Sequence, residues 1–161
     1  LQLPGAPGYH WYSVPRVGHP HPPTIQPAYP DHSRLQDQRR ERTALDPEQT
    51  ILGGFSMGTV MSYAMGLGPD RPSPLGILAF SGFIPIVEGW SPDLTRSGQT
   101  RVFITHGRWD PVIGVAFAQS ARDLLASAGF SVDYGESDAD HSIPPDELRR
   151  AVSWLARTVD E

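Results

Sequence analysis

The hydrophobic residues of this chain follow two different patterns, and the change comes near Thr50. Beyond that point, short apolar runs of strand length alternate with longer segments of helical character. The runs, rich in branched and aromatic side chains, are TILGGF, LGILAF, RVFITH and FSVDYG. Strands that alternate with helices are typical of a parallel sheet with helices on both faces, so the pattern predicts an α/β fold.

Three segments between and after these runs have the spacing of helices. MGTVMSYAMGLG directly follows Ser56, and GVAFAQSARDLLASAG carries apolar residues on one face and ends at Gly129, a good helix stop. The last segment, IPPDELRRAVSWLARTV, begins with prolines and acids. Its apolar spacing predicts one buried stripe, made of Leu148, Val152, Leu155 and Val159.

The first part of the chain lacks such a pattern. Residues 4–32 are rich in proline and show no hydrophobic period, which predicts an extended loop. Residues 33–43 favour a helix by propensity, but Leu35 is their one strongly apolar residue. We therefore expect a solvated helix or a disordered segment there.

Composition narrows the class of protein. The 161 residues suffice for one domain, which we expect to consist of a loop-rich segment over 1–45 and an α/β core over 46–161. A formal charge of −5 gives no electrostatic reason to expect nucleic acid as a partner, and no apolar run approaches the length of a membrane span. The sequence has no cysteine, which excludes disulfides and thiolate catalysis and favours a cytoplasmic location.

A candidate nucleophile lies between the first strand and the helix after it. Gly54-Phe55-Ser56-Met57-Gly58 is a G-x-S-x-G sequence, in which a sharp turn holds the serine in a strained conformation with its hydroxyl exposed. We expect both glycines to be required because side chains there would collide with the turn. The amide of Met57, at the helix N-terminus, would then face the oxygen of an attacked carbonyl as an oxyanion donor.

A serine needs an imidazole to take its proton and a carboxylate to orient that imidazole. Asp110 follows the strand RVFITH, with Pro111 to fix the turn, and His141 follows FSVDYG and precedes the last helix. Three strand ends thus supply Ser, Asp and His in the chain order that α/β-hydrolases require. The sequence predicts a catalytic triad of Ser56, Asp110 and His141.

Other residues compete for the acid and base roles. Asp138 and Asp140 are near the histidine, but an acid on the same short loop would rarely reach its far ring nitrogen, which favours Asp110. An aspartate before a proline is also common in plain turns. His106 ends a strand too, and we interpret it as a structural histidine that supports the Asp110 loop.

Two further groups of residues can be interpreted either as functional or as purely structural. The early histidines and a nearby Asp31 suggest metal binding, but proline between two of them and the absence of an ordered scaffold argue against it, so no metal is expected. These histidines are His10, His19, His21 and His32. Trp90 and Trp109 either border an acyl pocket or pack in the core or a lid.

In order along the chain, PGAPGYHWY, GGFSMG, SGFIP, HGRWDPVI and H-x-I-P-P resemble signatures of the bacterial phospholipase/carboxylesterase family, the group that includes acyl-protein thioesterases. The resemblance implies an α/β-hydrolase fold with Ser56 as nucleophile, Asp110 as orienting acid, His141 as base and the Met57 amide as one oxyanion donor. It also implies hydrolysis of short- to medium-chain carboxylic esters, or of thioesters and lysophospholipids, without a cofactor.

The sequence departs from that family in two places. Asp140 stands where the family usually has glycine, which bears on the geometry of the histidine loop. The family's early strands, with the H-G type loop that supplies a second oxyanion amide, have no counterpart, so we expect an N-terminally truncated sheet. The strand TILGGF would then lack a neighbour. Residues 1–4 in the vacant position, a homodimer through the exposed sheet edge, or a further segment of a longer protein would each cover it.

Three functions remain open from the sequence. The first is a serine-dependent carboxylester hydrolase acting on a small-molecule ester, weakened if one oxyanion donor is missing. The second is a catalytically weak or inactive remnant that acts as an oligomeric or interaction protein. The third is a serine peptidase, which would share the nucleophile but needs better protonation of its leaving group.

Overall fold

The computed structural model describes residues 9–160, and within them four parallel strands form one sheet in the order β1-β2-β3-β4. Each strand pairs with the next along the chain. Their bounds are β1 Ile51–Phe55, β2 Gly76–Phe80, β3 Arg101–Gly107 and β4 Ser131–Ser137. All four runs expected to be strands are confirmed, and with them the α/β fold class.

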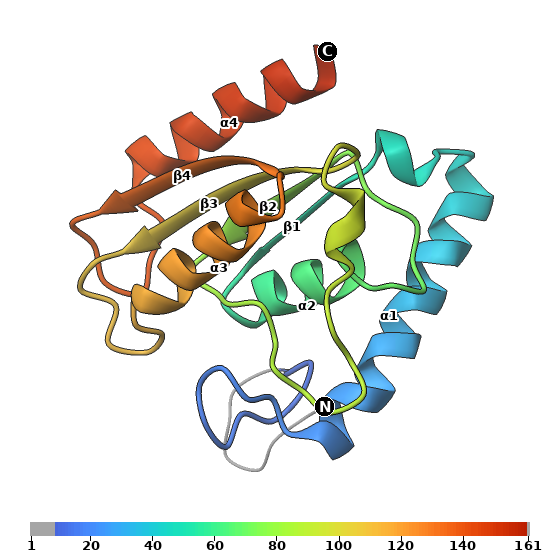
Figure 1. Ribbon diagram of the computed structural model, residues 1–161, viewed down its shortest axis with the longest axis horizontal. Coiled ribbons are helices and arrows are strands. Elements are labelled where there is room, and N and C mark those ends of the chain that lie inside the picture. Colours follow the sequence, from blue (N-terminus) through green and yellow to red (C-terminus); the bar gives the residue numbers. More distant parts are fainter. Residues whose placement is uncertain (1–8, 161) are drawn as a thin grey trace.

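Helices cover both faces of the sheet (Figure 1). Helices α2 (Met57–Gly66) and α3 (Ala116–Ser127) lie on one face, α4 (Pro145–Asp160) lies on the other, and α1 (Pro22–Thr43) lies beside α2. Two short 3-10 helices, Pro47–Gln49 and Leu94–Arg96, occupy connections. Because the carboxyl ends of all four strands lie at one edge, the residues that follow β1, β3 and β4 are brought together there.

Alternate residues of the central strands supply two hydrophobic cores. Ile77 and Ala79 of β2 belong to the core beneath α2 and α3, whereas Leu78 and Phe80 belong to the core beneath α4. Both sets are buried because the sheet is covered on both faces, which explains why the strands read as continuous apolar runs.

The buried stripe expected on α4 is wrong for three of its four residues: Leu148, Val152 and Val159 are 53%, 57% and 66% exposed. Leu155, the fourth, is partly buried against the core beneath α4. The buried residues of the helix are Glu147, Ala151, Trp154 and Thr158, each one position before a residue of the expected stripe. Trp154 packs against Phe103, with ring centroids 5.8 Å apart. Glu147 is buried because Thr105 and Arg150 both donate hydrogen bonds to its carboxylate at 2.7 Å.

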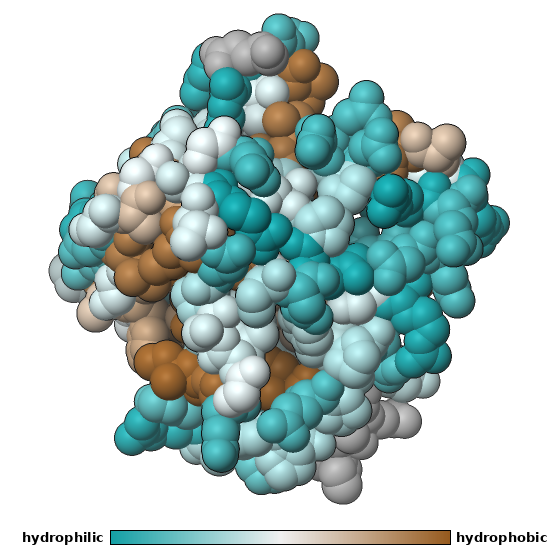
Figure 2. Space-filling model, turned by 45° about the vertical axis from the view of Figure 1, so that its right-hand side comes forward, coloured by the Kyte–Doolittle hydropathy of each residue, from teal (hydrophilic) through white to brown (hydrophobic). Residues whose placement is uncertain are grey.

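The extended loop expected over residues 4–32 is wrong from Pro22 onward, where α1 begins. Pro22 and Pro23 occupy the first turn, where proline is tolerated, but Pro27 and Pro30 lie inside the helix. Ile25 is buried against α2, and hydrophilic residues predominate on the side of the molecule where α1 lies (Figure 2). The solvated character expected of residues 33–43 therefore agrees with the structure.

The outer edge of β1 has no strand partner within residues 9–160. Residues 1–4, which could fill this position, lie outside the described part of the chain. Gly53 and Phe55 of β1 are exposed. No helix formed by residues 9–160 combines the length and the apolar character needed to cross a bilayer.

Candidate active site

Ser56 lies at the sharp turn between β1 and α2. Its backbone has φ 55° and ψ −117°, in a region that non-glycine residues rarely adopt. A side chain at Gly54 would collide with the backbone of Gly58 and Thr59, so the first glycine of the motif is required as expected. A Cβ at Gly58 would meet nothing within 4 Å, so the expected collision there is wrong.

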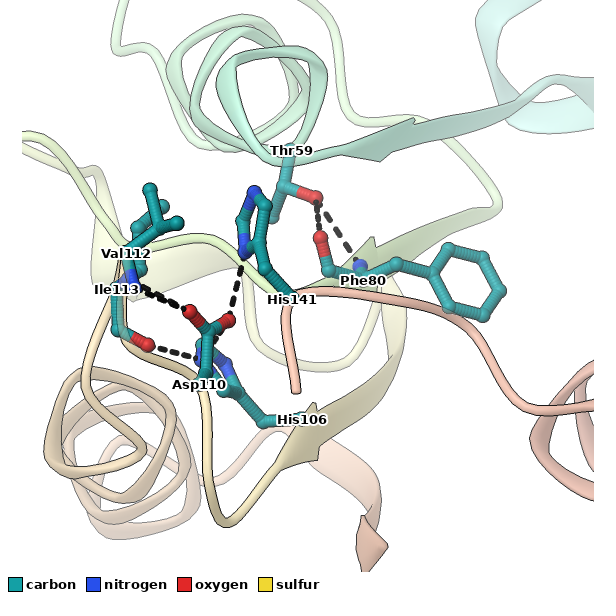
Figure 3. A network of polar contacts seen from close by, with 7 residues as sticks. All are labelled: Thr59, Phe80, His106, Asp110, Val112, Ile113 and His141. Atoms are coloured by element: carbon teal, nitrogen blue, oxygen red, sulfur yellow. Dashed lines mark hydrogen bonds and ion pairs between the residues drawn. The ribbon is translucent and has the colours of Figure 1, made fainter. Parts of the chain in front are cut away.

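Thr59 holds this turn, a role that the sequence analysis missed. Its hydroxyl lies 2.5 Å from the carbonyl of Gly54 and 2.7 Å from that of Phe80, and it accepts a bond from the Phe80 amide at 3.0 Å (Figure 3). The Ser56 amide also donates to the Phe80 carbonyl, at 2.9 Å. These bonds join the carboxyl ends of β1 and β2 beneath the serine.

Asp110 is buried directly after β3, with its side chain 0% exposed. Its Oδ1 accepts hydrogen bonds from the amides of Val112 and Ile113, both at 2.8 Å, and its Oδ2 lies 2.7 Å from Nδ1 of His141 (Figure 3). A carboxylate on one ring nitrogen of a histidine fixes the tautomer whose other nitrogen can accept a proton. The structure therefore brings two of the three predicted triad members together.

Burial of Asp110 acts to raise the pKa of its carboxyl group. The hydrogen bonds from His141, Ile113 and Val112 outweigh burial, so the pKa of Asp110 lies below its usual value. The group is therefore a carboxylate at neutral pH, as an orienting acid requires.

The loops that carry Asp110 and His141 are joined by backbone hydrogen bonds. The amides of Arg108 and Trp109 donate to the carbonyls of Ser137 and Ala139 at 2.8 and 3.0 Å. The backbone of Asp140 lies so close to Gly107 that a Cβ on Gly107 would collide with it. Asp140 itself is not among the described residues with positive φ, so this loop does not require glycine at that position.

His141 also lies next to the nucleophile turn. Its ring contacts that of Phe55, the residue before Ser56, with centroids 4.7 Å apart. Within residues 9–160, no hydrogen bond joins the Ser56 hydroxyl to His141, and the Met57 amide has no acceptor. Catalytic hydrogen bonds of unliganded enzymes are often long and tighten when substrate binds.

The other residues that the sequence offered for the acid and base roles occupy different environments. Asp138 is 75% exposed and accepts a bond from Arg108, which also pairs with Glu136. His106 is buried behind Asp110, as expected of a structural histidine. Trp109 is 71% exposed on the surface.

Trp90 lines a cavity of about 250 Å³ between α1 and the end of α2, to which Tyr29, Asp70 and Glu88 also contribute. Ser56, Asp110 and His141 do not line it.

Among the early histidines, the ring of His32 packs against Trp11 with centroids 5.0 Å apart. The described residues contain no group of three or more His, Cys, Asp or Glu side chains arranged to hold a metal ion.

Known proteins resemble this chain along most of its length. The profile of the Phospholipase/Carboxylesterase family matches residues 7–159. Acyl-protein thioesterase 1 of Gibberella zeae is 29% identical over 126 residues, covering 74% of this chain and 52% of that protein. Esterase YpfH of Escherichia coli is 29% identical over 123 residues, covering 74% and 50%. The chain thus spans about half the length of the curated relatives it matches.

Solved structures share the fold. Esterase PE8 superposes with a TM-score of 0.77 at 26% identity, covering 94% of this chain and 71% of that one. A carboxylesterase from Mesorhizobium loti gives a TM-score of 0.78 at 18% identity, covering 96% and 72%. These likenesses confirm the expected α/β-hydrolase-type fold.

Proposed function

Because this chain belongs to the phospholipase/carboxylesterase family, we propose that it is a serine-dependent carboxylester hydrolase. The observation that carries the proposal is the 2.7 Å contact between Asp110 Oδ2 and His141 Nδ1, with the ring of His141 against the residue that precedes Ser56. A buried carboxylate on one ring nitrogen, and a strained serine next to the residue that the ring contacts, support the assignment of a triad.

In the proposed reaction, the Ser56 hydroxyl attacks the ester carbonyl while Nε2 of His141 takes its proton. The imidazolium so formed is stabilised by Asp110, and the amide of Met57 donates a hydrogen bond to the oxyanion. His141 then protonates the leaving alkoxide, which leaves an acyl group on Ser56. Water activated by the same imidazole releases the acid and restores the serine.

We further propose acyl esters of short to medium chain length as substrates, with thioesters as a second class. The name of the thioesterase relatives supports the second class. No cofactor is needed, since attack, proton transfer and oxyanion stabilisation are all assigned to side chains or backbone of the chain. The chemistry takes place on a small-molecule ester or an acyl group that reaches the open carboxyl edge of the sheet.

A catalytically weak or inactive protein with an oligomeric or interaction role is the second candidate function. The outer edge of β1 supports it: within residues 9–160 this edge has no strand partner, and an apolar edge strand is a template for pairing with another chain. A homodimer through this edge is the arrangement we propose, and sizing chromatography over a range of concentrations measures it.

Labelling with a fluorophosphonate tests the principal proposal, because the probe reacts with a serine that has a working base. We expect one label on Ser56, and turnover of p-nitrophenyl butyrate that Ser56→Ala abolishes. Ser120→Ala, on the exposed face of α3, is the control and should keep both. A protein that forms dimers but takes no label would support the second function instead.

A further inference from the structure

His106 lies at the end of β3 behind the Asp110 carboxylate, and the proposed proton transfer does not use it. Its side chain is 0% exposed. One ring nitrogen, Nε2, lies 2.7 Å from the carbonyl oxygen of Ile113 and 3.3 Å from Oδ2 of Asp110 (Figure 3). Two acceptors therefore face the same nitrogen.

The surroundings of His106 fix its tautomer. A backbone carbonyl can only accept, so the contact with Ile113 requires a proton on Nε2. The other nitrogen, Nδ1, is buried and has no hydrogen-bond partner among residues 9–160. A proton there would leave a buried, charged donor unpaired, which is costly, so His106 is the neutral Nε2–H form.

The N–H of His106 donates to the Ile113 carbonyl, and Nε2 lies 3.3 Å from Oδ2 of Asp110, so the imidazole packs against the carboxylate. The carboxylate accepts from the amides of Val112 and Ile113 on Oδ1 and from His141 on Oδ2, so His106 holds the same turn whose amides bind Asp110. Rotation of the carboxylate about its Cβ–Cγ bond would break several of these bonds at once.

We infer that His106 is a positioning residue for the reaction: its imidazole, bonded to the Ile113 carbonyl and packed 3.3 Å from Oδ2, holds the Asp110 carboxylate in the orientation in which Oδ2 faces His141. The inference rests on the proposed ester hydrolysis and assigns the orientation of the acid to a second histidine. His106 touches neither Ser56 nor the substrate, so it acts through Asp110.

Few other charges reach this group. Directly after β3, Arg108 is paired with Glu136 of β4 and Asp138 of the following loop. Asp140 presents its backbone carbonyl to Gly107, and α3 contributes the uncharged Gln119, bonded to Glu136. Hence the side chains against Asp110 that a variant can change without removing a formal charge are chiefly His141 and His106.

His106→Leu and His106→Gln together test the inference. Leucine removes the donor, and we expect kcat to fall between about tenfold and a hundredfold with KM unchanged, because a misplaced catalytic group slows chemistry without weakening binding. The terminal amide of glutamine reaches the position of Nε2, so His106→Gln should keep kcat within a few-fold.

Thr100→Val is the matched control. Thr100 is buried just before β3 and donates a side-chain hydrogen bond to the carbonyl of Pro74 at 2.7 Å. Its loss should lower the melting temperature but leave kcat unchanged. If Thr100→Val reduces kcat as much as His106→Leu at equal melting temperature, the effect is general loss of rigidity and the inference fails.

Nitrogen-15 NMR of the histidines tests the same inference without turnover. We expect His106 as the neutral Nε2–H tautomer, and a His141 Nδ1–H resonance that moves in His106→Leu but stays in place in His106→Gln. A proton on Nδ1 of His106, or a His141 resonance that neither variant moves, would overturn it. Absence of the fluorophosphonate label on Ser56 would instead defeat the proposed function alone.

Discussion

At the scale of single residues, the two oxygens of the Asp110 carboxylate have different tasks. Oδ1 accepts from the amides of Val112 and Ile113 and shapes the turn, while Oδ2 faces His141. The same side chain therefore shapes its own loop and contacts the imidazole that we propose as the base. Asp138, closer to His141 in the sequence, is at the surface with Arg108 and does neither.

Asp110→Asn and Asp138→Asn separate these acids. We expect Asp110→Asn to lower kcat by about 10⁴, because an amide cannot hold the imidazole in the required tautomer or stabilise its charged form. Asp138→Asn should leave kcat within a few-fold, since it removes one exposed ion pair with Arg108. Hydrolysis of p-nitrophenyl butyrate measures both. Equal losses in the two variants would contradict the assignment.

The two glycines of the nucleophile turn should differ in their tolerance of alanine. At Gly54 a Cβ meets backbone, which cannot move aside, so we expect Gly54→Ala to destabilise the protein by about 3 kcal/mol or more. At Gly58, on the first turn of α2, the space is open, and alanine should be neutral or stabilising by up to about 1 kcal/mol. Urea unfolding measures both, and a Gly58→Ala as unstable as Gly54→Ala would contradict the geometry.

The sequence predicted Ser56, Asp110 and His141 as site residues because reactive side chains at strand ends stand out against apolar runs, and the structure brings the last two into contact. It missed Thr59, since a threonine on a buried helix gives no signal of which carbonyls it will meet. The reason given for Gly58 was wrong because the direction of its missing side chain depends on the path of α2, which local sequence does not fix.

At the scale of elements, the hydroxyl of Thr59 on α2 is hydrogen-bonded to the carboxyl ends of both β1 and β2. Thr59→Val keeps the shape and removes bonds to Gly54 and Phe80, so we expect a loss of about 1–3 kcal/mol in stability and a lower kcat. Ser62→Ala is the control on the same helix, because the Ser62 hydroxyl bonds the carbonyl of Gly58 one turn earlier. Thermal unfolding and turnover should both be affected more by Thr59→Val.

Strands were easier to predict than helix faces. A strand buried on both sides is apolar throughout, whereas the buried face of α4 depends on which residues find partners. Glu147 faces inward because Thr105 and Arg150 bind it, and an apolar-stripe argument cannot anticipate this. Similarly, α1 continues through Pro27 and Pro30, and contacts with residues far along the sequence, such as the ion pair of its Asp37 with Arg71, stabilise it.

At the scale of the whole molecule, several apolar features remain uncovered within residues 9–160. Two of them are the outer edge of β1 and the exposed side of α4 formed by Leu148, Val152 and Val159. Exposed features of this kind mark surfaces that pair with something else. The edge is the more specific of the two because its backbone groups require a partner strand.

A lysine on the edge tests the homodimer proposed above. Gly53 is exposed on β1, and Gly53→Lys places a charge where a second copy would pair. We expect it to shift the protein toward monomer in sizing chromatography. Ser153→Lys, at an exposed position of α4, should leave the distribution as it is. Dimers that survive Gly53→Lys unchanged would rule out this edge as their interface.

The left-handed backbone at Ser56 has an evolutionary consequence. Glycine adopts such a conformation freely, so Ser56→Gly should be more stable to heat than Ser56→Ala, by about 1 kcal/mol. Selection for durability alone would therefore drive this position toward glycine. If descendants of this sequence keep serine at this position, selection for reactivity outweighs the gain in stability that glycine would bring.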